Sequence, residues 1–259
     1  MDFGIITLSI VPVRESPSDK SEMVTQLLFG ELVAVDESRD GWIAIRNVYD
    51  NYEGWIDAKQ LQLIGEEEFN RLNKYDPCYV NDLVEVVQDL ENYQTIPVVM
   101  GSVIRNLEND VFSMAGKDYE YTGRYICSGS DPTLKEVLEH AMMFMNTPYL
   151  WGGKSPFGID CSGFVQLVFT LSGVYLLRDA AEQAGLGEHV SFLDEARPGD
   201  LLFFDNQEGD IVHVGILLPD HEIIHASGKV RIDRIDHQGI YNADLGKYTH
   251  SLRLIRRIL

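Results

Sequence analysis

Cys161, His213 and His225 are the side chains whose types and spacing could carry out nucleophilic catalysis. Cys161 follows Asp160, and the apolar residues after it recur at helical spacing, which predicts a helix over 161–172. Asp160 is a favourable N-cap residue. Cys161 would then lie in the first helical turn, where unpaired backbone N–H groups and the helix dipole favour a thiolate. We interpret Cys161 as a candidate nucleophile; the alternative is a small buried core cysteine.

The two histidines are equidistant from position 219, in the middle of a predicted turn between two strands. A hairpin symmetric about that position would place His213 and His225 opposite each other on one face, with Cβ atoms about 4.5–5.5 Å apart. His213 would then activate Cys161, and His225 would fix the ring and tautomer of His213. The alternatives are two half-buried histidines, or a metal pair that has no evident third ligand. The remaining histidines are predicted to lie on the first helix (His140) or at the surface (His189, His221, His237, His250).

The elements that must position these residues fall into three parts. Residues 1–64 contain short β-rich runs with frequent turn signals, which predict a small barrel. A short helical connector is predicted over 65–73, and 76–127 is β-rich again. The polar run 128–132 marks a boundary, and Pro132 favours a helix start. Helices come first and strands after them in 128–259, which predicts an α+β domain.

Composition narrows the class of protein. The formal net charge of the 259 residues is −20, from 21 Lys and Arg against 41 Asp and Glu. This acidity argues against nucleic acid and against a polyanionic surface as partner. Three cysteines, an odd and sparse count without zinc-site spacing, fit a reducing compartment. No signal peptide or apolar run of transmembrane length is recognisable. We therefore expect a cytoplasmic protein. Nucleophilic catalysis by a thiol needs no cofactor, and the cysteine spacing predicts no metal site.

Several motifs make the C-terminal part similar to the NlpC-type cell-wall peptidases, which are papain-like cysteine peptidases. They are P-Y-L-W-G-G (148–153), D-C-S-G-F-V (160–165), R-P-G-D-L-L-F-F (197–204), H-V-G-I (213–216) and I-H-A-S (224–227). The resemblance implies Cys161 as nucleophile, His213 as general base and His225 as third polar residue. It also implies a γ-D-glutamyl–diamino acid endopeptidase that acts on peptidoglycan stem peptides.

The N-terminal part resembles bacterial SH3-like domains, through G-E-L-V-A-V (30–35), G-W-I-A-I (41–45) and E-G-W-I (53–56). We interpret 1–64 as one SH3-like domain, 65–127 as a second and more divergent one, and 128–259 as the peptidase. The predicted fold class is thus an α+β papain-like catalytic domain preceded by two all-β SH3-like barrels. This layout is similar to the subgroup that trims free murein peptides, in which the first barrel reads a free N-terminal L-Ala.

The same resemblance implies a set of substrate-binding residues. Tyr149 and Trp151 would wall the cleft, Asp160 would hold the terminal ammonium, and Ser162 would hold the D-Glu α-carboxylate. The other predicted substrate-binding residues are Arg178 and Asp179 in the family's loop, and Glu22 and Tyr52 in the first barrel. Position 180 is Ala where the family often has a hydroxyl residue, so one carboxylate contact is missing or comes from backbone N–H groups.

Two other functions are compatible with parts of the sequence. A secreted hydrolase that acts on intact wall is one, if a signal peptide has been removed. A non-catalytic scaffold that binds peptides through SH3-like domains is the other, although the complete Cys161, His213 and His225 set argues against it. The expected partner is a small peptide, L-Ala-γ-D-Glu-diamino acid. The sequence specifies neither the diamino acid, diaminopimelate or Lys, nor the oligomeric state.

Overall fold

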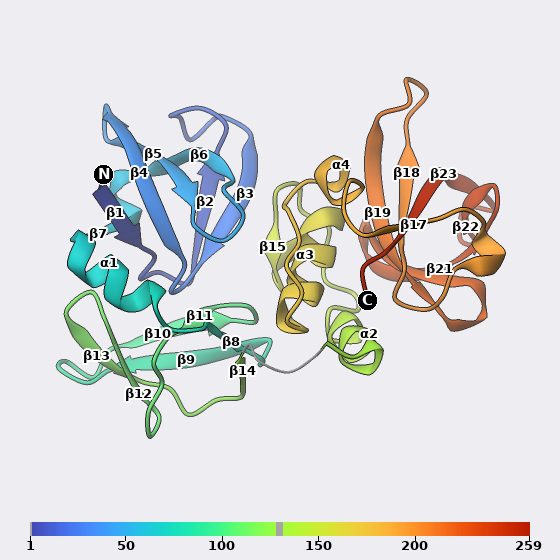
Figure 1. Ribbon diagram of the computed structural model, residues 1–259. Coiled ribbons are helices and arrows are strands. Elements are labelled where there is room, and N and C mark those ends of the chain that lie inside the picture. Colours follow the sequence, from blue (N-terminus) through green and yellow to red (C-terminus); the bar gives the residue numbers. More distant parts are fainter. Residues whose placement is uncertain (1, 128–131) are drawn as a thin grey trace. The chain divides into compact units, whose positions relative to one another are not determined.

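The computed structural model describes residues 2–127 and 132–259 (Figure 1). The chain divides into two compact units, Met1–Gly129 with Gly152–Pro156, and Ser130–Trp151 with Phe157–Leu259. The predicted boundary at 128–132 lies outside the described residues except for Pro132. One difference from a strictly sequential division is that Gly152–Pro156, within the predicted peptidase domain, groups with the N-terminal unit. No helix in the described ranges is both long and apolar enough to span a membrane.

A seven-stranded antiparallel sheet forms the first part of the N-terminal unit, in the order β3-β2-β6-β5-β4-β1-β7. Alternating apolar residues of these strands point to one core, which includes Val11, Val33 and Ile45. The strands are β1 (Asp2–Ile5), β2 (Ile10–Arg14), β3 (Met23–Leu28), β4 (Leu32–Arg39), β5 (Trp42–Asn47), β6 (Glu53–Asp57) and β7 (Gln62–Ile64), with a 3-10 turn at Ala58–Gln60.

Helix α1 (Glu66–Asn73) confirms the predicted connector and leads into two small sheets. Their orders are β10-β9-β13-β12 and β11-β8-β14. The strands are β8 (Cys78–Val80), β9 (Val84–Asp89), β10 (Thr95–Val99), β11 (Val103–Ile104), β12 (Val111–Met114), β13 (Lys117–Glu120) and β14 (Tyr125–Cys127). Because Phe29, Leu72 and Phe112 share one core, residues 65–127 pack as part of the same unit as the first sheet.

Two of the three cysteines form a disulfide, which differs from the sparse free thiols expected from the sequence. Cys78 in β8 lies directly opposite Cys127 in β14, and the two are bonded. Cys161 is the remaining, free cysteine.

The segment Gly152–Pro156 is held in the N-terminal unit by buried polar contacts. Lys154, in β15 (Lys154–Ser155), donates its Nζ to Glu31 at 2.8 Å and its backbone N–H to Gln26 at 2.8 Å. Gly152 has φ 71°, and a Cβ there would lie 2.2 Å from the backbone oxygen of Met23. Only glycine fits this close approach in a left-handed conformation.

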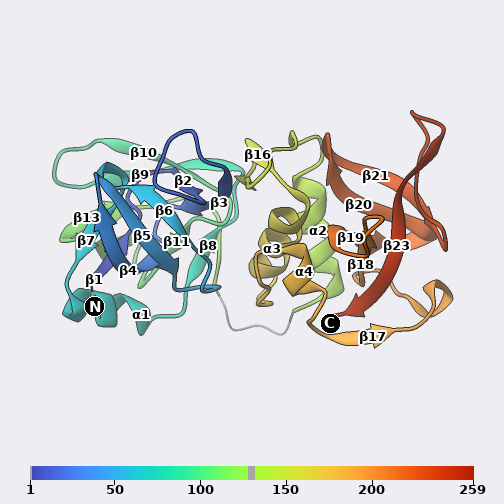
Figure 2. The ribbon, with the colours of Figure 1, turned by 90° about the horizontal axis from the view of Figure 1, so that it is seen from above.

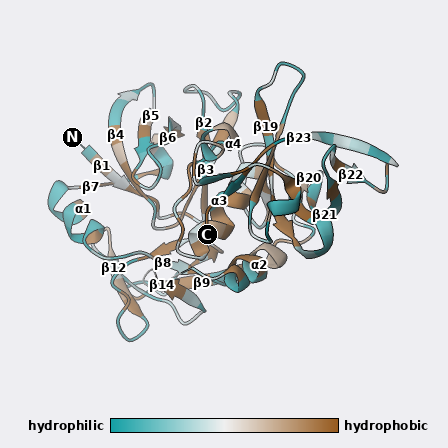
Figure 3. Cartoon of the chain, turned by 45° about the vertical axis from the view of Figure 1, so that its right-hand side comes forward, coloured by the Kyte–Doolittle hydropathy of each residue, from teal (hydrophilic) through white to brown (hydrophobic). Residues whose placement is uncertain are grey.

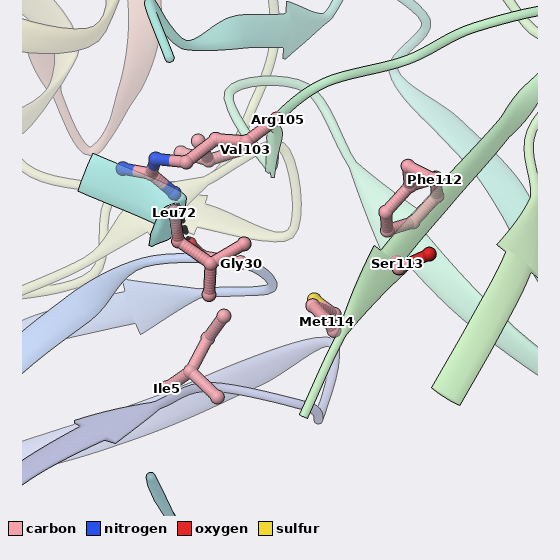
Figure 4. A pocket seen from close by; sticks show the side chains of 8 residues that line it. All are labelled: Ile5, Gly30, Leu72, Val103, Arg105, Phe112, Ser113 and Met114. Atoms are coloured by element: carbon pink, nitrogen blue, oxygen red, sulfur yellow. Dashed lines mark hydrogen bonds between the residues drawn. The ribbon is translucent and has the colours of Figure 1, made fainter. Parts of the chain in front are cut away.

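A cavity of about 10 Å³ lies inside the N-terminal unit, among Ile5, Leu72, Phe112 and Arg105 (Figure 4). The guanidinium of Arg105 donates Nη1 to the backbone oxygen of Gly30 at 2.6 Å. A volume of this size has room for about one water molecule, so it is a gap in the packing rather than a ligand site.

The C-terminal unit begins with helices. They are α2 (Leu134–Met143), α3 (Cys161–Leu171) and the single turn α4 (Ala180–Gln183); β16 (Gly158–Ile159) precedes α3. The first helix starts at an N-cap Thr133 that forms a capping box with Glu136, so Pro132 precedes the cap instead of opening the helix. Helix α3 confirms the predicted 161–172 run to within one residue.

Six strands close into a barrel, because β23 pairs with both β18 and β22 in the order β18-β19-β20-β21-β22. The strands are β18 (Leu201–Asp205), β19 (Ile211–Leu218), β20 (Glu222–Ser227), β21 (Lys229–Asp236), β22 (Gly239–Asn242) and β23 (Lys247–Arg257), with β17 (Glu188–Val190) added outside β23. Helix α3 packs on β19 and β20 (Figure 2). Hydrophobic residues concentrate in strands such as β19 (Figure 3).

Candidate active site

Cys161 is the first residue of α3 and is 7% exposed. The N-cap Asp160 accepts the backbone N–H of Gly163 at 2.7 Å, which fixes the first turn of the helix. The Cys161 sulfur accepts hydrogen bonds from the backbone N–H groups of Val214 and Ser162. Because Val214 follows His213 in β19, the first of these bonds places the thiol against the strand that carries the predicted base.

Burial opposes the thiolate that helix position alone predicts. Burial, and then the negative charge of Asp160, raise the pKa of the Cys161 thiol from 9.0 to about 12. The two N–H groups and the positive charge of Arg178 lower the pKa but do not offset burial. Cys161 is therefore a neutral thiol at pH 7, and its proton must leave during the reaction.

A buried cluster surrounds the start of α3. Arg178, only 1% exposed, binds both carboxylate oxygens of Asp160, with Nη1–Oδ1 3.0 Å and Nη2–Oδ2 2.6 Å. Its Nη1 also donates to Ser162 Oγ at 2.9 Å. The structure therefore brings together three of the predicted substrate-binding residues. It also gives Asp160 an internal cation partner, which a substrate ammonium would have to share.

The hairpin register differs from the one the sequence predicts. His225 pairs with Gly215, so the hairpin is centred on position 220 and not 219. The cause is the loop, in which Asp220 and His221 both take left-handed conformations, φ 60° and 57°. A shift of two positions keeps side chains on the same face, so His213 and His225 are diagonal neighbours instead of direct partners.

Gly215 makes this diagonal contact possible. A Cβ at Gly215 would lie 2.9 Å from the Cβ of His225 and 2.8 Å from Ile223. The missing side chain leaves room for His213 Nε2 to reach His225 Nδ1 at 2.8 Å. The glycine of the H-V-G-I motif therefore serves the histidine pair.

The polar chain continues beyond the residues that the sequence analysis identified. His225 Nε2 lies 3.1 Å from Asp233 Oδ2, and all three side chains of this row are buried. Arg231 Nη2 donates to Asp233 Oδ1 at 2.8 Å. Sequence reasoning missed Asp233, although a signal exists, because Asp233 takes the inward position two residues before the buried Ile235 in β21.

His250 is the other missed residue, since it was expected at the surface. Its ring stacks on His213 with centroids 4.2 Å apart and planes 22° apart. Position 250 belongs to β23, which closes the barrel and so brings the ring to the histidine cluster. Closure of a barrel is not readable from local pattern, which explains the error.

Two histidines of the cluster, His213 and His250, have lowered pKa values and are neutral near pH 7. Burial, and then the neighbouring His225 and His250, hold the pKa of His213 well below 6.5. Burial lowers the pKa of His250 to about 4. Burial raises the pKa of the Asp233 carboxyl, but hydrogen bonds from His225 and Arg231 outweigh it, so the net pKa is lowered and Asp233 is a carboxylate. The carboxylate of Asp233 therefore places a negative charge at the inner end of the cluster.

The other predicted residues lie as follows. Tyr149 is half-buried, and burial is the main cause that raises its pKa to about 12. Trp151 is 60% exposed, and Asp179 is the exposed N-cap of α4. Ala180, where the family often has a hydroxyl, is the buried first residue of α4. Two more belong to the N-terminal unit: exposed Glu22 before β3, and half-buried Tyr52 between β5 and β6.

Metal binding was the alternative use of the histidine pair. Across residues 2–127 and 132–259, no group of three or more His, Cys, Asp or Glu side chains could hold a metal ion. A thiol at a helix N-terminus, packed against strands that carry a histidine pair and a carboxylate, is the arrangement of a cysteine peptidase.

Comparisons with known proteins agree with that class. The NlpC/P60 family model matches residues 146–248, and that of the bacterial dipeptidyl-peptidase SH3 domain matches 13–61. Gamma-D-glutamyl-L-lysine dipeptidyl-peptidase of Bacillus subtilis is 30% identical over 78% of this chain and 71% of that protein. Dipeptidyl-peptidase 6 of Lysinibacillus sphaericus is 26% identical over 93% of this chain and 95% of that protein.

The fold has a close counterpart among solved structures. A NlpC/P60 family protein from Bacillus cereus ATCC 10987 superposes with a TM-score of 0.85 at 21% identity, covering 99% of each chain. The chain belongs to the NlpC/P60 family of cysteine peptidases and carries an N-terminal SH3-like domain.

Proposed function

We propose that this chain hydrolyses the γ-D-glutamyl–diamino acid bond of peptidoglycan stem peptides that have a free N-terminal L-Ala, in cytoplasmic murein peptide recycling. The observation that carries the chemistry is the thiol of Cys161 at the start of α3, hydrogen-bonded to the residue that follows His213. The substrate class is supported by relatives from Bacillus subtilis and Bacillus cereus named gamma-D-glutamyl-L-lysine dipeptidyl-peptidase.

The reaction is acyl transfer through a thioester. Since His213 Nε2 is bonded to His225, Nδ1 is the ring nitrogen that takes the thiol proton. The sulfur then forms a bond to the γ-carbonyl carbon, and His213 returns the proton to the leaving amine as the C–N bond breaks. Water next attacks the thioester, giving up a proton to His213. The C–S bond breaks, and that proton restores the thiol.

Two groups stabilise the oxyanion in this proposal. The backbone N–H of Cys161 is at the first helical position, where a helix has no internal acceptor for it. The Tyr149 hydroxyl, whose pKa is raised, keeps its proton at pH 7 and can donate. No cofactor enters these steps.

Substrate recognition extends the proposal to residues predicted from the sequence. Ser162 and Arg178 would receive the D-Glu α-carboxylate, and Asp160, Glu22 and Tyr52 the terminal ammonium. Tyr149 and Trp151 would wall the cleft, and Asp179 and the backbone at Ala180 would complete the loop. We also assign 65–127 as a second SH3-like domain, supported by its two small antiparallel sheets.

The test compares L-Ala-γ-D-Glu-diaminopimelate, its Lys counterpart and the N-acetylated form of each, with products identified by mass. We expect cleavage after D-Glu and a kcat/KM at least about 30-fold lower for the acetylated peptides, since loss of one side of a buried charge pair costs about 2–5 kcal/mol. Equal values for free and acetylated peptides would remove the amine pocket and the recycling role.

One observation favours a second function, an exported hydrolase of intact wall. The Cys78–Cys127 disulfide is typical of proteins in oxidising compartments. Incubation with purified sacculi separates the two functions. Release of soluble fragments from sacculi supports the wall hydrolase, and turnover confined to free peptides supports recycling.

A further inference from the structure

We propose that Asp233 is a positioning residue that sets the proton positions of both active-site histidines. The carboxylate can only accept a hydrogen bond, so His225 must carry its proton on Nε2, 3.1 Å from Asp233 Oδ2. In this proposal that proton is the single ring proton of His225, which leaves a bare Nδ1. This inference deepens the proposed function, because it concerns the same base.

The next contact passes the constraint to His213. His213 Nε2 lies 2.8 Å from the bare Nδ1 of His225, so Nε2 must be the donor and carry the proton. The lowered pKa of His213 keeps its ring neutral, so Nδ1 holds a lone pair. The carboxylate of Asp233 therefore acts through His225 on His213. It leaves Nδ1 of His213 ready to take a proton from Cys161.

Arg231 fixes which way a side chain at position 233 is oriented. Its Nη2 makes a well-formed bond of 2.8 Å to Asp233 Oδ1, whereas its Nε, although 2.7 Å from Oδ2, makes no hydrogen bond. Arg231 donates at both nitrogens and accepts at neither. Because Nη2 makes a hydrogen bond to position 233 and Nε makes none, an amide there would turn its oxygen toward Nη2 and its NH₂ group toward His225.

With this orientation, Asp233→Asn should reverse the tautomers of both His225 and His213. The amide NH₂ donates to His225 Nε2, which moves the His225 proton to Nδ1. His225 Nδ1 then donates to His213 Nε2, and the His213 proton moves to Nδ1, where the base needs a lone pair. Loss of the correct imidazole tautomer in a carboxylate–histidine pair lowers kcat by about 10⁴ in another peptidase class. We expect a decrease of about 10²–10⁴ here, with KM changed less than about threefold.

The experiment measures kcat, KM and imidazole ¹⁵N chemical shifts for wild type and Asp233→Asn in the full chain. The matched control is Asp200→Asn, because Asp200 is equally buried and is bound by Arg257 at 2.9 and 2.7 Å but lies outside the histidine row. We expect Asp200→Asn to lower thermal stability and leave kcat within about twofold. The double variant Asp233→Asn with Arg231→Gln frees the amide to turn, and should recover at least about tenfold in kcat.

The ¹⁵N spectra decide the inference without any substrate, so its failure is separable from failure of the proposed function. Bare Nδ1 on both rings in wild type, and bare Nε2 on both in Asp233→Asn, supports it. Unchanged tautomers in Asp233→Asn overturn it, even if kcat falls, because Asp233 would then act only through packing. A kcat within threefold of wild type together with reversed tautomers also overturns it.

Discussion

The candidate active site contains two aspartate–arginine pairs in which the aspartate is buried, and they differ in what the aspartate does with its second partner. Next to Cys161, both carboxylate oxygens of Asp160 accept hydrogen bonds from Arg178. One of these oxygens also accepts the backbone N–H of Gly163 in the first turn of α3. Beyond His213 and His225, Asp233 accepts a hydrogen bond from Arg231 Nη2 on one oxygen and contacts His225 with the other. The first pair fixes backbone and side chains in place, and the second also determines where protons sit. The same residue types therefore supply rigidity at one end and tautomer control at the other.

The largest effect that tests this comparison is removal of the reacting groups themselves. Cys161→Ala should lower kcat/KM by more than about 10⁴, and His213→Ala by a similar factor, because residues that act as a unit are not additive. His225→Ala should lower kcat strongly but less than His213→Ala, since an orienting group matters less than the base. Circular dichroism checks that each variant is folded. Wild-type activity of His225→Ala would contradict the contact with His213.

Asp160→Asn should be mainly a stability variant. It leaves the guanidinium of Arg178, 1% exposed, without its anion, and breaking a buried pair costs about 3–5 kcal/mol. Denaturant unfolding measures this loss. We expect Asp160→Asn to be less stable than Asp233→Asn and yet to retain the higher kcat. If the two variants had the same free energy of unfolding and the same kcat, the two pairs would not differ in role.

Gly215→Ala should disturb the base end alone. An added Cβ meets His225 at 2.9 Å and must displace it from His213. We expect a decrease in kcat of about 10- to 100-fold, comparable to a misplaced catalytic group. Gly41→Ala is not a matched control because its φ is positive. A better one is Gly65→Ala, whose Cβ meets nothing within 4 Å and which should leave kcat unchanged. Unaltered activity of Gly215→Ala would show that the strands adjust.

The smallest effect is a displacement along the pH axis. His213 must be unprotonated to accept the thiol proton, and burial holds its pKa well below 6.5. Activity should therefore persist as pH falls through 6.5 and decline only when His213 gains a proton. The pH dependence of kcat/KM measures this limb, and a limb at or above 6.5 contradicts the lowered pKa of His213. Iodoacetamide labelling complements it: Cys161, with a thiol pKa of about 12, should react faster with each rise in pH through 9.

Local sequence signals predicted more of the nucleophile end than of the base end. Asp160 as N-cap, Cys161 at the first helical position and the helix after them follow from spacing within a dozen residues. The histidine pair was predicted on the right face, because parity survives a two-residue error in the turn. Asp233 and His250 depend on which strands pair across the closed barrel. The raised pKa of Cys161 depends on how the folded chain packs around the thiol. Strand pairing across a barrel and packing around a buried thiol both involve residues far apart in the sequence, so a short stretch of sequence predicts neither of them.

The buried pair between Lys154 and Glu31 has a consequence for how such proteins recombine. The N-terminal unit contains Gly152–Pro156, a segment that ends four residues before Asp160, so the two units are not independent modules in sequence. A chimera that exchanges residues 1–127 for another SH3-like domain would leave the Lys154 ammonium without its carboxylate unless the donor supplies one. The two parts of this enzyme therefore cannot be exchanged separately, and Glu31 and Lys154 should be replaced together or not at all.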